Sequence, residues 1–369
     1  MELYGKRWTR RELEARVGRL EQIGGLRRLQ WTEGAETGTE QVQVRTGAGL
    51  AYYVSLSRGL DISLAEYGGV PISWQSQNGD VHPAFYDASG AEWLRTAAGG
   101  LLMTCGLTQA GSPNHDNGEA LGLHGRAHHL PAKQVSARGQ WIGDEYEMTV
   151  SGVVEESSFF GDHLRLTREI RSVLGQNRIS IRDTVENAGF RVSPHMMLYH
   201  FNFGYPLMDE GTRIDIPGSV TVSPREETVP AAGWNEWQPP DPEYAERVYY
   251  HEIKPDAEGW AEARILNPHF PSAGFAGGHG GAPGSGFGRP VQVRLAWNCA
   301  PLPRLVQWKM PGAGTHVLGI EPANCHVGGR AAERAQGTLV MLEPGQQIRY
   351  ELELEIEEAG SAANPASRS

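Results

Sequence analysis

The sequence has few cysteines and no long apolar run. Its three cysteines, Cys105, Cys299 and Cys325, are widely spaced and form no Cys-X-X-Cys pair. An odd number at such spacing predicts neither a disulfide framework nor a thiolate zinc site, and we expect reduced, buried thiols. No stretch approaches the ~18 apolar residues of a membrane span, and the charged N-terminus lacks the apolar segment of a signal peptide. We therefore expect a cytoplasmic protein with no membrane partner.

Positive charge is also scarce. The chain has 33 lysines and arginines against 44 aspartates and glutamates, which gives a formal net charge of -11. A protein that binds nucleic acid needs a basic face to gain from counterion release, so nucleic acid is excluded as an expected partner. The hydrophobic content of 39% is ordinary for a soluble globular protein and predicts a sizeable core.

From Arg28 onward the chain consists of short apolar segments broken by Gly, Asn, Asp and Pro. Residues 163–171 and 177–185 alternate between apolar and polar around a Leu-Gly-Gln-Asn turn, which predicts a hairpin. Residues 337–342 and 347–356 flank Glu343-Pro344-Gly345 and predict a second hairpin. Because no repeated helical pattern separates these strands, the fold class is all-β, an antiparallel sandwich rather than a βαβ fold.

The two ends of the chain differ from this pattern. Thr9 and Glu12 form a capping box, and apolar residues recur at helical spacing through Leu20 until Gly24 and Gly25 end the helix. We expect three parts: a helical segment at 1–25, a single β-sandwich domain at 26–358 and a disordered tail at 359–369. The glycine-rich stretch 273–288 is predicted to be a loop. It either covers a site or is a solvent-exposed connection with no role in one, and the second interpretation is favoured.

Two segments place histidines in surroundings suited to chemistry. His124 is followed by Gly125, which lets the backbone approach a ligand closely, and imidazole exchanges protons near neutral pH; the alternative is a turn histidine. In the extended run 194–206, His200 and Asn202 project to the same side as Leu198. An unpaired buried polar group costs roughly 1–3 kcal/mol, so this pair on a core strand favours a functional interpretation.

A carboxylate and several arginines complete the candidates. Glu321 ends the apolar run 317–320 beside a proline, where a raised pKa would suit a general base; the alternative is an exposed glutamate at a strand end. Arg58 and Arg95 each carry a planar fork that either holds hydroxyl or phosphate oxygens or pairs with a surface acid.

Four segments, in this order, resemble motifs of the aldose 1-epimerases of the galactose mutarotase-like superfamily and of hexose-6-phosphate epimerases. They are the His-Gly segment LHGR, the second-histidine strand LYHFNFGYP, the glutamate strand VLGIEPAN and the closing hairpin LEPGQQIRYELELEI. The resemblance covers residues 95–356 and is closest to an uncharacterised aldose 1-epimerase-like branch. It implies an antiparallel β-supersandwich, here with a short N-terminal helix, whose cleft binds a small-molecule sugar.

The resemblance also implies roles. Glu321 would take the anomeric hydroxyl proton, His200 would protonate the ring oxygen, and His124 would bind and polarise the sugar. Proton transfers alone balance ring opening, so no cofactor or metal is expected. The substrate-binding candidates are Arg58, Arg95, Arg126, Asn202 and Glu246, with Asp241 as the other candidate for the family's additional acidic residue. We expect a monomer or a homodimer.

Two other functions stay open at this stage. The same scaffold can perform enolising chemistry on a keto-sugar, as an isomerase or lyase, with a metal held by surplus histidines such as His124, His128 and His195. Alternatively, the protein binds carbohydrate without turnover, using some of its ten tryptophans to stack on sugar faces.

Overall fold

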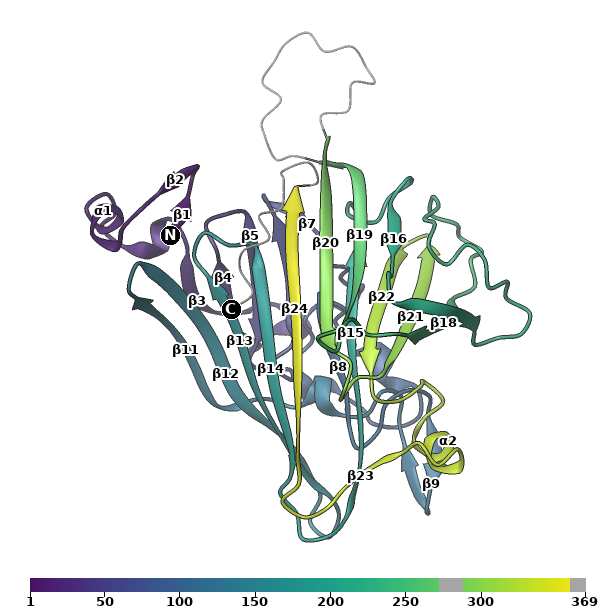
Figure 1. Cartoon of the computed structure of the whole chain (residues 1–369). Coiled ribbons are helices and arrows are strands. Elements are labelled where there is room, and N and C mark those ends of the chain that lie inside the picture. Colours follow the sequence, from purple (N-terminus) through teal and green to yellow (C-terminus); the bar gives the residue numbers. More distant parts are fainter. Residues whose placement is uncertain (272–287, 359–369) are drawn as a thin grey trace.

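Antiparallel strands make up most of the chain. The computed structural model describes residues 1–271 and 288–358, in which two large sheets pack face to face (Figure 1). The first sheet has eight strands, in the spatial order β11 (Lys133–Ile142), β12 (Glu145–Ser157), β13 (His163–Val173), β14 (Arg178–Asn187), β24 (Gln347–Glu358), β20 (Gly288–Asn298), β19 (Trp260–Pro271) and β16 (Arg213–Asp215).

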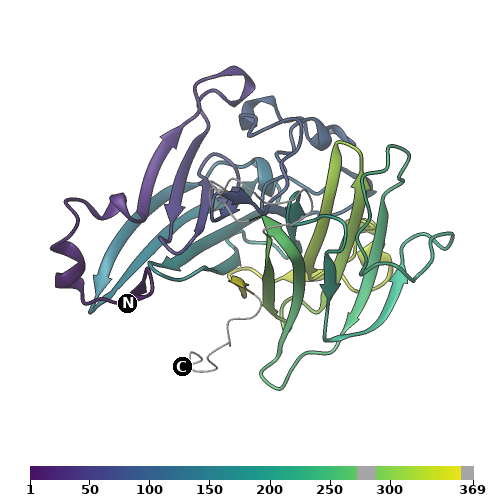
Figure 2. The same ribbon diagram turned by 90° about the horizontal axis from the view of Figure 1, so that it is seen from above.

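The second sheet is larger and contains twelve strands. Its main path is β17 (Ser219–Pro224), β18 (Arg247–Ile253), β21 (Arg304–Gly312), β22 (Thr315–Ala323), β15 (Ser193–Gly204), β8 (Leu102–Leu107), β6 (Ile62–Tyr67), β5 (Leu50–Ser55), β4 (Glu40–Arg45) and β3 (Gly25–Gln30). Two short strands extend it, β23 (Val340–Leu342) beside β15 and β7 (Val70–Pro71) beside β6. Figure 2 shows the N-terminal strands, in purple, on one flank of the molecule and the strands β17, β18, β21 and β22, in green to yellow-green, on the other.

The remaining elements are short. Two small hairpins are formed by β1 (Glu2–Leu3) with β2 (Lys6–Arg7) and by β9 (Asn114–Asp116) with β10 (Glu119–Leu121). The helices are α1 (Arg10–Glu14) and α2 (Arg330–Ala335), with 3₁₀ turns η1 (Leu20–Gln22), η2 (Gly34–Glu36), η3 (Pro83–Phe85), η4 (Glu92–Arg95) and η5 (Ala127–His129). Within the described residues, no helix is long and apolar enough to cross a membrane.

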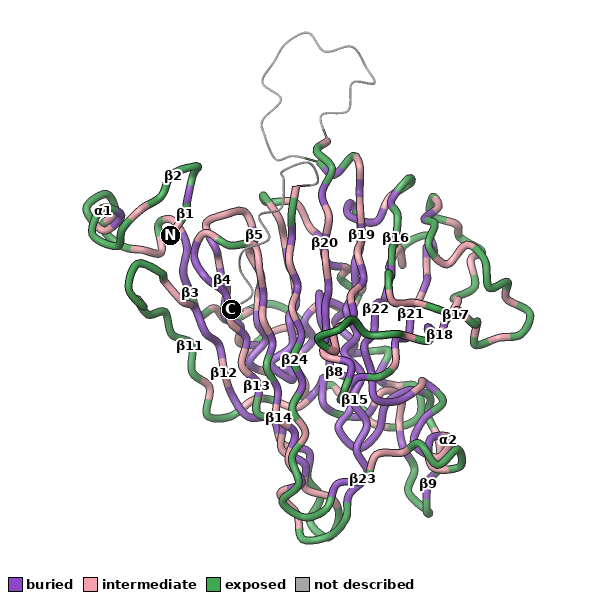
Figure 3. Tube along the Cα trace, in the orientation of Figure 1, coloured by how far each residue is buried: buried purple, intermediate pink, exposed green. Residues whose placement is uncertain are grey.

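The core lies between the two sheets. Alternate residues of β13 and β14 face it, as in the pair Ile170 and Ile181, which meet Tyr52 and Phe201 of the larger sheet in one buried apolar cluster. Figure 3 shows this burial concentrated in the central strands. Strand β15 is buried along its whole length. The side chains that face the eight-stranded sheet pack in this core, and the apolar ones on the opposite face belong to a second buried apolar cluster, which includes Met196.

The predicted all-β antiparallel architecture and the hairpin of β13 and β14 are confirmed. The second predicted hairpin is wrong. Strand β23 pairs with β15, whereas β24 pairs with β14 and β20 in the opposite sheet. The Pro-Gly turn therefore carries the chain from one sheet to the other. Pairing with the long strands β14 and β20 places Leu352 and Leu354 of β24 in the core, whereas β23 offers only three residues to pair with. The buried apolar area therefore favours the crossing between sheets.

The N-terminal helix is shorter than expected. The capping box of Thr9 and Glu12 is present in both directions, but α1 ends at Glu14. Val17 and Gly18 follow, two residues with poor helix propensity, and Leu20 belongs to a separate 3₁₀ turn. The glycine-rich stretch predicted as a loop, up to residue 287, and the tail at 359–369 lie outside the described residues; Gly288 begins β20.

A fully partnered charge network crosses the core. Arg168 is completely buried and donates to Asp183 (Nη2 to Oδ2, 2.7 Å) and to Asp61 (Nη1 to Oδ1, 2.9 Å). Asp61 also accepts from the backbone N–H of Thr104 and contacts Nδ1 of His128 at 2.6 Å. Burial opposes ionisation of Asp61, but the bonds from His128, Arg168 and Thr104 together hold its pKa below the ordinary value.

We expect Arg168→Met to lower the free energy of unfolding by about 3–5 kcal/mol, because it leaves two buried carboxylates without their cation. Denaturant unfolding measures this. Arg182→Met, on the exposed face of the next strand with its side chain 66% exposed, is the matched control and should change stability by less than about 1 kcal/mol. Equal losses in the two variants would contradict the role given to the network.

Candidate active site

His200 and Glu321 lie side by side on neighbouring strands of the large sheet. Strand β15 carries His200, and β22 carries Glu321; the two strands pair antiparallel, with Asn202 opposite Gly319. His200 Nε2 is 3.2 Å from Glu321 Oε1, and their side chains are only 8% and 3% exposed. Both project from the face of the sheet that turns away from the eight-stranded sheet, since their strand neighbours Phe201 and Ile320 face the core between the sheets.

A second imidazole, that of His124, joins this pair. Its ring centroid is 5.8 Å from that of His200, edge to face. The turn that carries it is tightly held. The backbone N–H of His124 donates to Gly111 O at 2.8 Å. A Cβ on Gly125 would lie only 2.5 Å from Gly106 O, so only glycine fits at that position. The Gly111 N–H points to His124 Nδ1 at 3.4 Å, which leaves Nε2 to carry the ring proton.

Among the residues that the structure describes, three buried polar atoms at this point form no hydrogen bond: Nδ1 of His200, Oδ1 of Asn202 and Oε1 of Glu321. Oε1 of Glu321 lies 3.2 Å from His200 Nε2, but the two atoms are not aligned for a hydrogen bond. The amide nitrogen of Asn202 is held by Gly100 O (3.1 Å) and His200 O (3.0 Å), which fixes its side chain. A Cβ on Gly319 would lie 2.6 Å from Glu321 Oε1 and 3.2 Å from His200 Cε1. Only a glycine at 319 lets the two side chains lie this close over the strand. Buried polar atoms are normally satisfied, so the unsatisfied atoms of this group mark a place for a polar ligand.

Burial governs the protonation of the cluster. It lowers the pKa of His200 to about 3 and that of His124 to about 4, and it raises the pKa of Glu321 well above its ordinary value. At pH values between these two shifted pKa values, the neighbouring His200 and Glu321 therefore hold a single proton between them. Such a pair can give a proton at one atom of a ligand and take one from another.

Aromatic and charged side chains surround the cluster on its outer side. Trp308 lies 5.6 Å from the His200 ring and 6.2 Å from Trp74, and Trp93 lies 5.0 Å from the His124 ring, all as centroid separations. These three tryptophans were not singled out in the sequence, which gives no signal for them because indoles are common in cores as well as in sites.

Glu246, an exposed residue just before β18, lies at the outer edge of the cluster. Its Oε2 accepts from Trp308 Nε1 at 2.9 Å, and its Oε1 accepts from Arg225 Nη2 at 3.0 Å. After burial, the charge of Glu246 is the next cause that raises the pKa of Glu321, whereas the charge of Arg225 lowers it. Arg225 had no sequence signal, since an arginine in a polar loop is ordinary.

The other three predicted arginines are not brought to the cluster. Arg58 is buried and donates to the carbonyl oxygens of Val81 and Thr96, so its guanidinium is committed to the fold. Arg95 has its side chain 78% exposed and pairs with Glu92. Arg126 is exposed and lines a separate small pocket with Glu156.

The surplus histidines do not form a metal site. His128 Nδ1 faces Asp61 at 2.6 Å, and both ring nitrogens of His195 are used, by Leu107 O at 3.0 Å and the Tyr350 hydroxyl at 2.6 Å. Across residues 1–271 and 288–358, no group of three or more His, Cys, Asp or Glu residues is placed to hold a metal ion.

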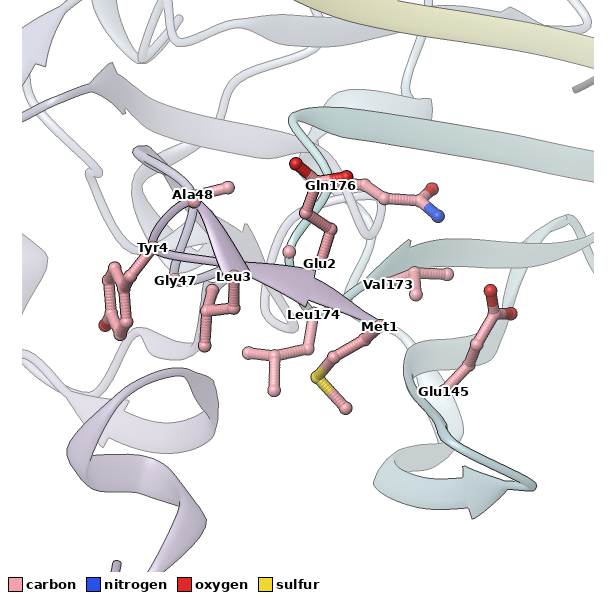
Figure 4. Close-up of a pocket in the computed structure, with 12 residues that line it drawn as sticks. Met1, Glu2, Leu3, Tyr4, Gly47, Ala48, Glu145, Val173, Leu174 and Gln176 are labelled. Carbon is pink, nitrogen blue, oxygen red and sulfur yellow. The ribbon is translucent and has the colours of Figure 1, made fainter. Parts of the chain in front are cut away.

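A larger hollow of about 700 Å³ lies at the N-terminal end of the chain (Figure 4). Met1, Leu3 and Leu174 are among the residues that line it, and its carboxylates, Glu2 and Glu145, are exposed. None of its lining residues has a buried side-chain polar atom without a partner. It therefore lacks the features that set the His200 cluster apart.

Comparisons with known proteins agree with this fold. A family model described as Domain of unknown function (DUF4432) matches residues 36–356, and no curated protein matches the sequence. A solved Klebsiella pneumoniae protein provisionally named an aldose 1-epimerase is 25% identical, with a TM-score of 0.77 over 90% of this chain and 83% of its own. A galactose mutarotase-like protein from Clostridium acetobutylicum is 13% identical (TM-score 0.58; 91% and 99% covered). Galactose 1-epimerase from Lactobacillus acidophilus is 10% identical (TM-score 0.55; 90% and 98% covered). The predicted galactose mutarotase-like supersandwich is thereby confirmed.

The raised pKa of Glu321 predicts a pH-dependent cost in stability. Above pH 4.5 the unfolded chain releases this proton while the folded chain keeps it, so stability falls with rising pH until the folded pKa is passed. Glu321→Gln removes this loss. We expect the variant to be at least ~1 kcal/mol more stable than the parent at pH 7, with the gain vanishing toward pH 4. Denaturant unfolding across pH tests this, with the exposed Glu227→Gln as the control, which should change stability at pH 7 by less than about 0.5 kcal/mol.

Proposed function

The chain belongs to the family described as Domain of unknown function (DUF4432), and from its likeness to the solved Klebsiella protein together with the site we propose that it is an aldose 1-epimerase-like isomerase. In this proposal it interconverts the anomers of a small sugar by opening and reclosing the pyranose ring. The observation that carries the proposal is the buried pair of His200 and Glu321, 3.2 Å apart and each with an unpartnered polar atom.

The chemistry follows from charge accounting. When the C1–O5 bond breaks, O5 gains negative charge and must be protonated, while the hydroxyl on C1 loses its proton as C1 becomes a carbonyl. In the proposed mechanism, Glu321 takes the O1 proton, His200 gives a proton to O5, and His124 donates its Nε2–H to a substrate oxygen. O1 and O5 are bonded to the same carbon, so an acid and a base a few ångströms apart suit this step.

The single proton of the pair serves both groups. Transfer from the carboxyl of Glu321 to His200 produces a carboxylate base and an imidazolium acid, and ring opening returns both to their neutral forms. After rotation about C1–C2, the reverse transfers close the ring on the other face. The proton count balances over the cycle with no oxidant or reductant, so the proposal calls for no cofactor.

The binding partner in this proposal is a sugar that meets an aromatic wall. Trp308 and Trp74 supply apolar ring faces, and Asn202 supplies a fixed acceptor. Binding without turnover would account for the tryptophans but not for a buried acid and base with opposed pKa shifts. The cytoplasmic location and the monomeric or dimeric state stay predictions.

Glu321→Gln should lose at least ~10²-fold in turnover, and His200→Ala should lose a similar amount, because each removes one of the two proton transfers. NMR or polarimetry of anomeric exchange across a panel of aldoses, corrected for spontaneous exchange, measures this. His115→Ala, at an exposed histidine of β9, is the matched control and should retain full activity. Near-parental turnover by Glu321→Gln on any true substrate would rule out its assigned role.

The pH–rate profile should fall at both ends. Below the lowered pKa of His200, about 3, the pair holds two protons and no base remains; above the raised pKa of Glu321 it holds none and no acid remains. We therefore expect a plateau through the mildly acidic range and a loss of rate as pH rises through the upper apparent pKa. A profile that instead climbs with pH through neutrality would contradict the shared-proton assignment.

A further inference from the structure

A single ion pair closes the neck of the segment between β17 and β18. This segment begins at Arg225 and ends at Glu246, and Arg225 Nη2 meets Glu246 Oε1 at 3.0 Å. The Arg225 N–H also donates to Val248 O at 2.8 Å, so the start of the segment is fastened to β18. Farther along, Lys309 Nζ donates to Gly233 O (2.6 Å) and Glu236 O (2.7 Å), which fastens the segment to β21.

The second oxygen of Glu246 continues the chain of contacts inward. Oε2 accepts from the indole N–H of Trp308, and the Trp308 ring lies edge to face against His200. In the pairing of β21 with β22, Trp308 is opposite Gly319, the glycine against which Glu321 Oε1 and His200 Cε1 pack. Arg225, Glu246 and Trp308 thus connect the loop neck to the proposed acid and base through hydrogen bonds and one ring contact.

This arrangement changes the interpretation of Glu246. Both of its carboxylate oxygens already accept a hydrogen bond from the protein, one from a guanidinium and one from an indole. It was expected from the sequence to bind substrate directly. Its contacts instead suit a residue that orients its neighbours.

We propose that Arg225 and Glu246 are positioning residues of the active site, which fix the Trp308 indole as the wall of the sugar site and set the charge around Glu321. This inference rests on the proposed function for its kinetic consequences only. The ion pair is partly exposed, with side chains 33% and 51% accessible, so its removal should scarcely change folding stability. Its effects should appear in binding and in protonation.

The two charges act on Glu321 in opposite directions, Glu246 raising its pKa and Arg225 lowering it. Other titratable groups also face Glu321 from the elements packed around it, and the variants below leave them unchanged. These groups are His200 on β15, Cys105 on β8, Tyr250 on β18 and Cys325 after β22. His124, in the 122–125 turn, lies against His200.

The experiment compares Arg225→Gln and Glu246→Gln with Arg247→Gln, a neighbouring arginine that stacks on Tyr244. In the pH–rate profile the descending limb should move to higher pH in Arg225→Gln and to lower pH in Glu246→Gln, and stay in place in Arg247→Gln. A loss of packing alone would not move the limb in opposite directions. Shifts of the same sign, or no shift, overturn the proposal.

Binding supplies a second readout. In Arg225→Gln, Glu246 holds the Trp308 indole less firmly, and the sugar loses a contact that substrate and transition state make equally. This variant should therefore raise KM by about tenfold with kcat changed little. Trp308→Phe, which lacks the indole N–H, should raise KM similarly, and adding Arg225→Gln to it should have little further effect. Fully additive losses would overturn the positioning role.

A third measurement needs no turnover. Glu321→Gln should stabilise the protein by an amount that grows with pH until Glu321 of the parent ionises in the folded state. The pH limit of this growth should be higher in an Arg225→Gln background and lower in a Glu246→Gln background. If no sugar is turned over but these two limits still diverge, the proposed function fails while the positioning of charge around Glu321 stands. If turnover is found and the limits coincide, the inference fails alone.

Discussion

The burial of Glu321 beside His200 is the constraint on which the rest of the site depends. Both side chains are held on the central strands of the large sheet, where the backbone pairing of β15 with β22 sets their separation. Dryness there drives both groups toward neutral forms, and that is what makes one proton available to two atoms. The surrounding residues either keep this place dry, as Trp308 does, or adjust its charge, as Glu246 and Arg225 do.

A second buried polar cluster of the chain, around Arg168, differs from this site in its hydrogen bonding. Around Arg168 the carboxylates of Asp61 and Asp183 are met by guanidinium and hydroxyl or amide donors, so that network is complete without any ligand. At His200 and Glu321 the polar atoms are equally buried but stay unpartnered. Burial alone does not distinguish a structural network from a functional one; the state of the hydrogen bonds does.

Sequence patterns predicted the features that depend on local order. The alternation of β13 and β14 specified their hairpin, and the alternation of β15 placed His200 and Asn202 on one face. The partner of β24 could not be predicted, because a Pro-Gly turn permits either a hairpin or a crossing between sheets. The place of Arg58 could not be predicted for a similar reason: its long side chain is directed by tertiary packing, which no short motif encodes. The positioning role that we propose for Glu246 had no signal in the sequence, because its partner Arg225 lies 21 residues away.

The segment from Arg225 to Glu246 has a consequence for how such a protein can diversify. Its neck is pinned by one ion pair and its wall-forming contact passes through a single carboxylate, while the acid and base belong to the sheet beneath. Trp237 anchors the segment in the core, whereas residues 226–232 are largely exposed. Changing the length or composition of that exposed stretch leaves the pairing of β15 and β22 intact, and doubling a loop costs only about 0.6 kcal/mol in closure entropy. Selection can therefore exchange this stretch, while the reactive groups stay inherited with the scaffold.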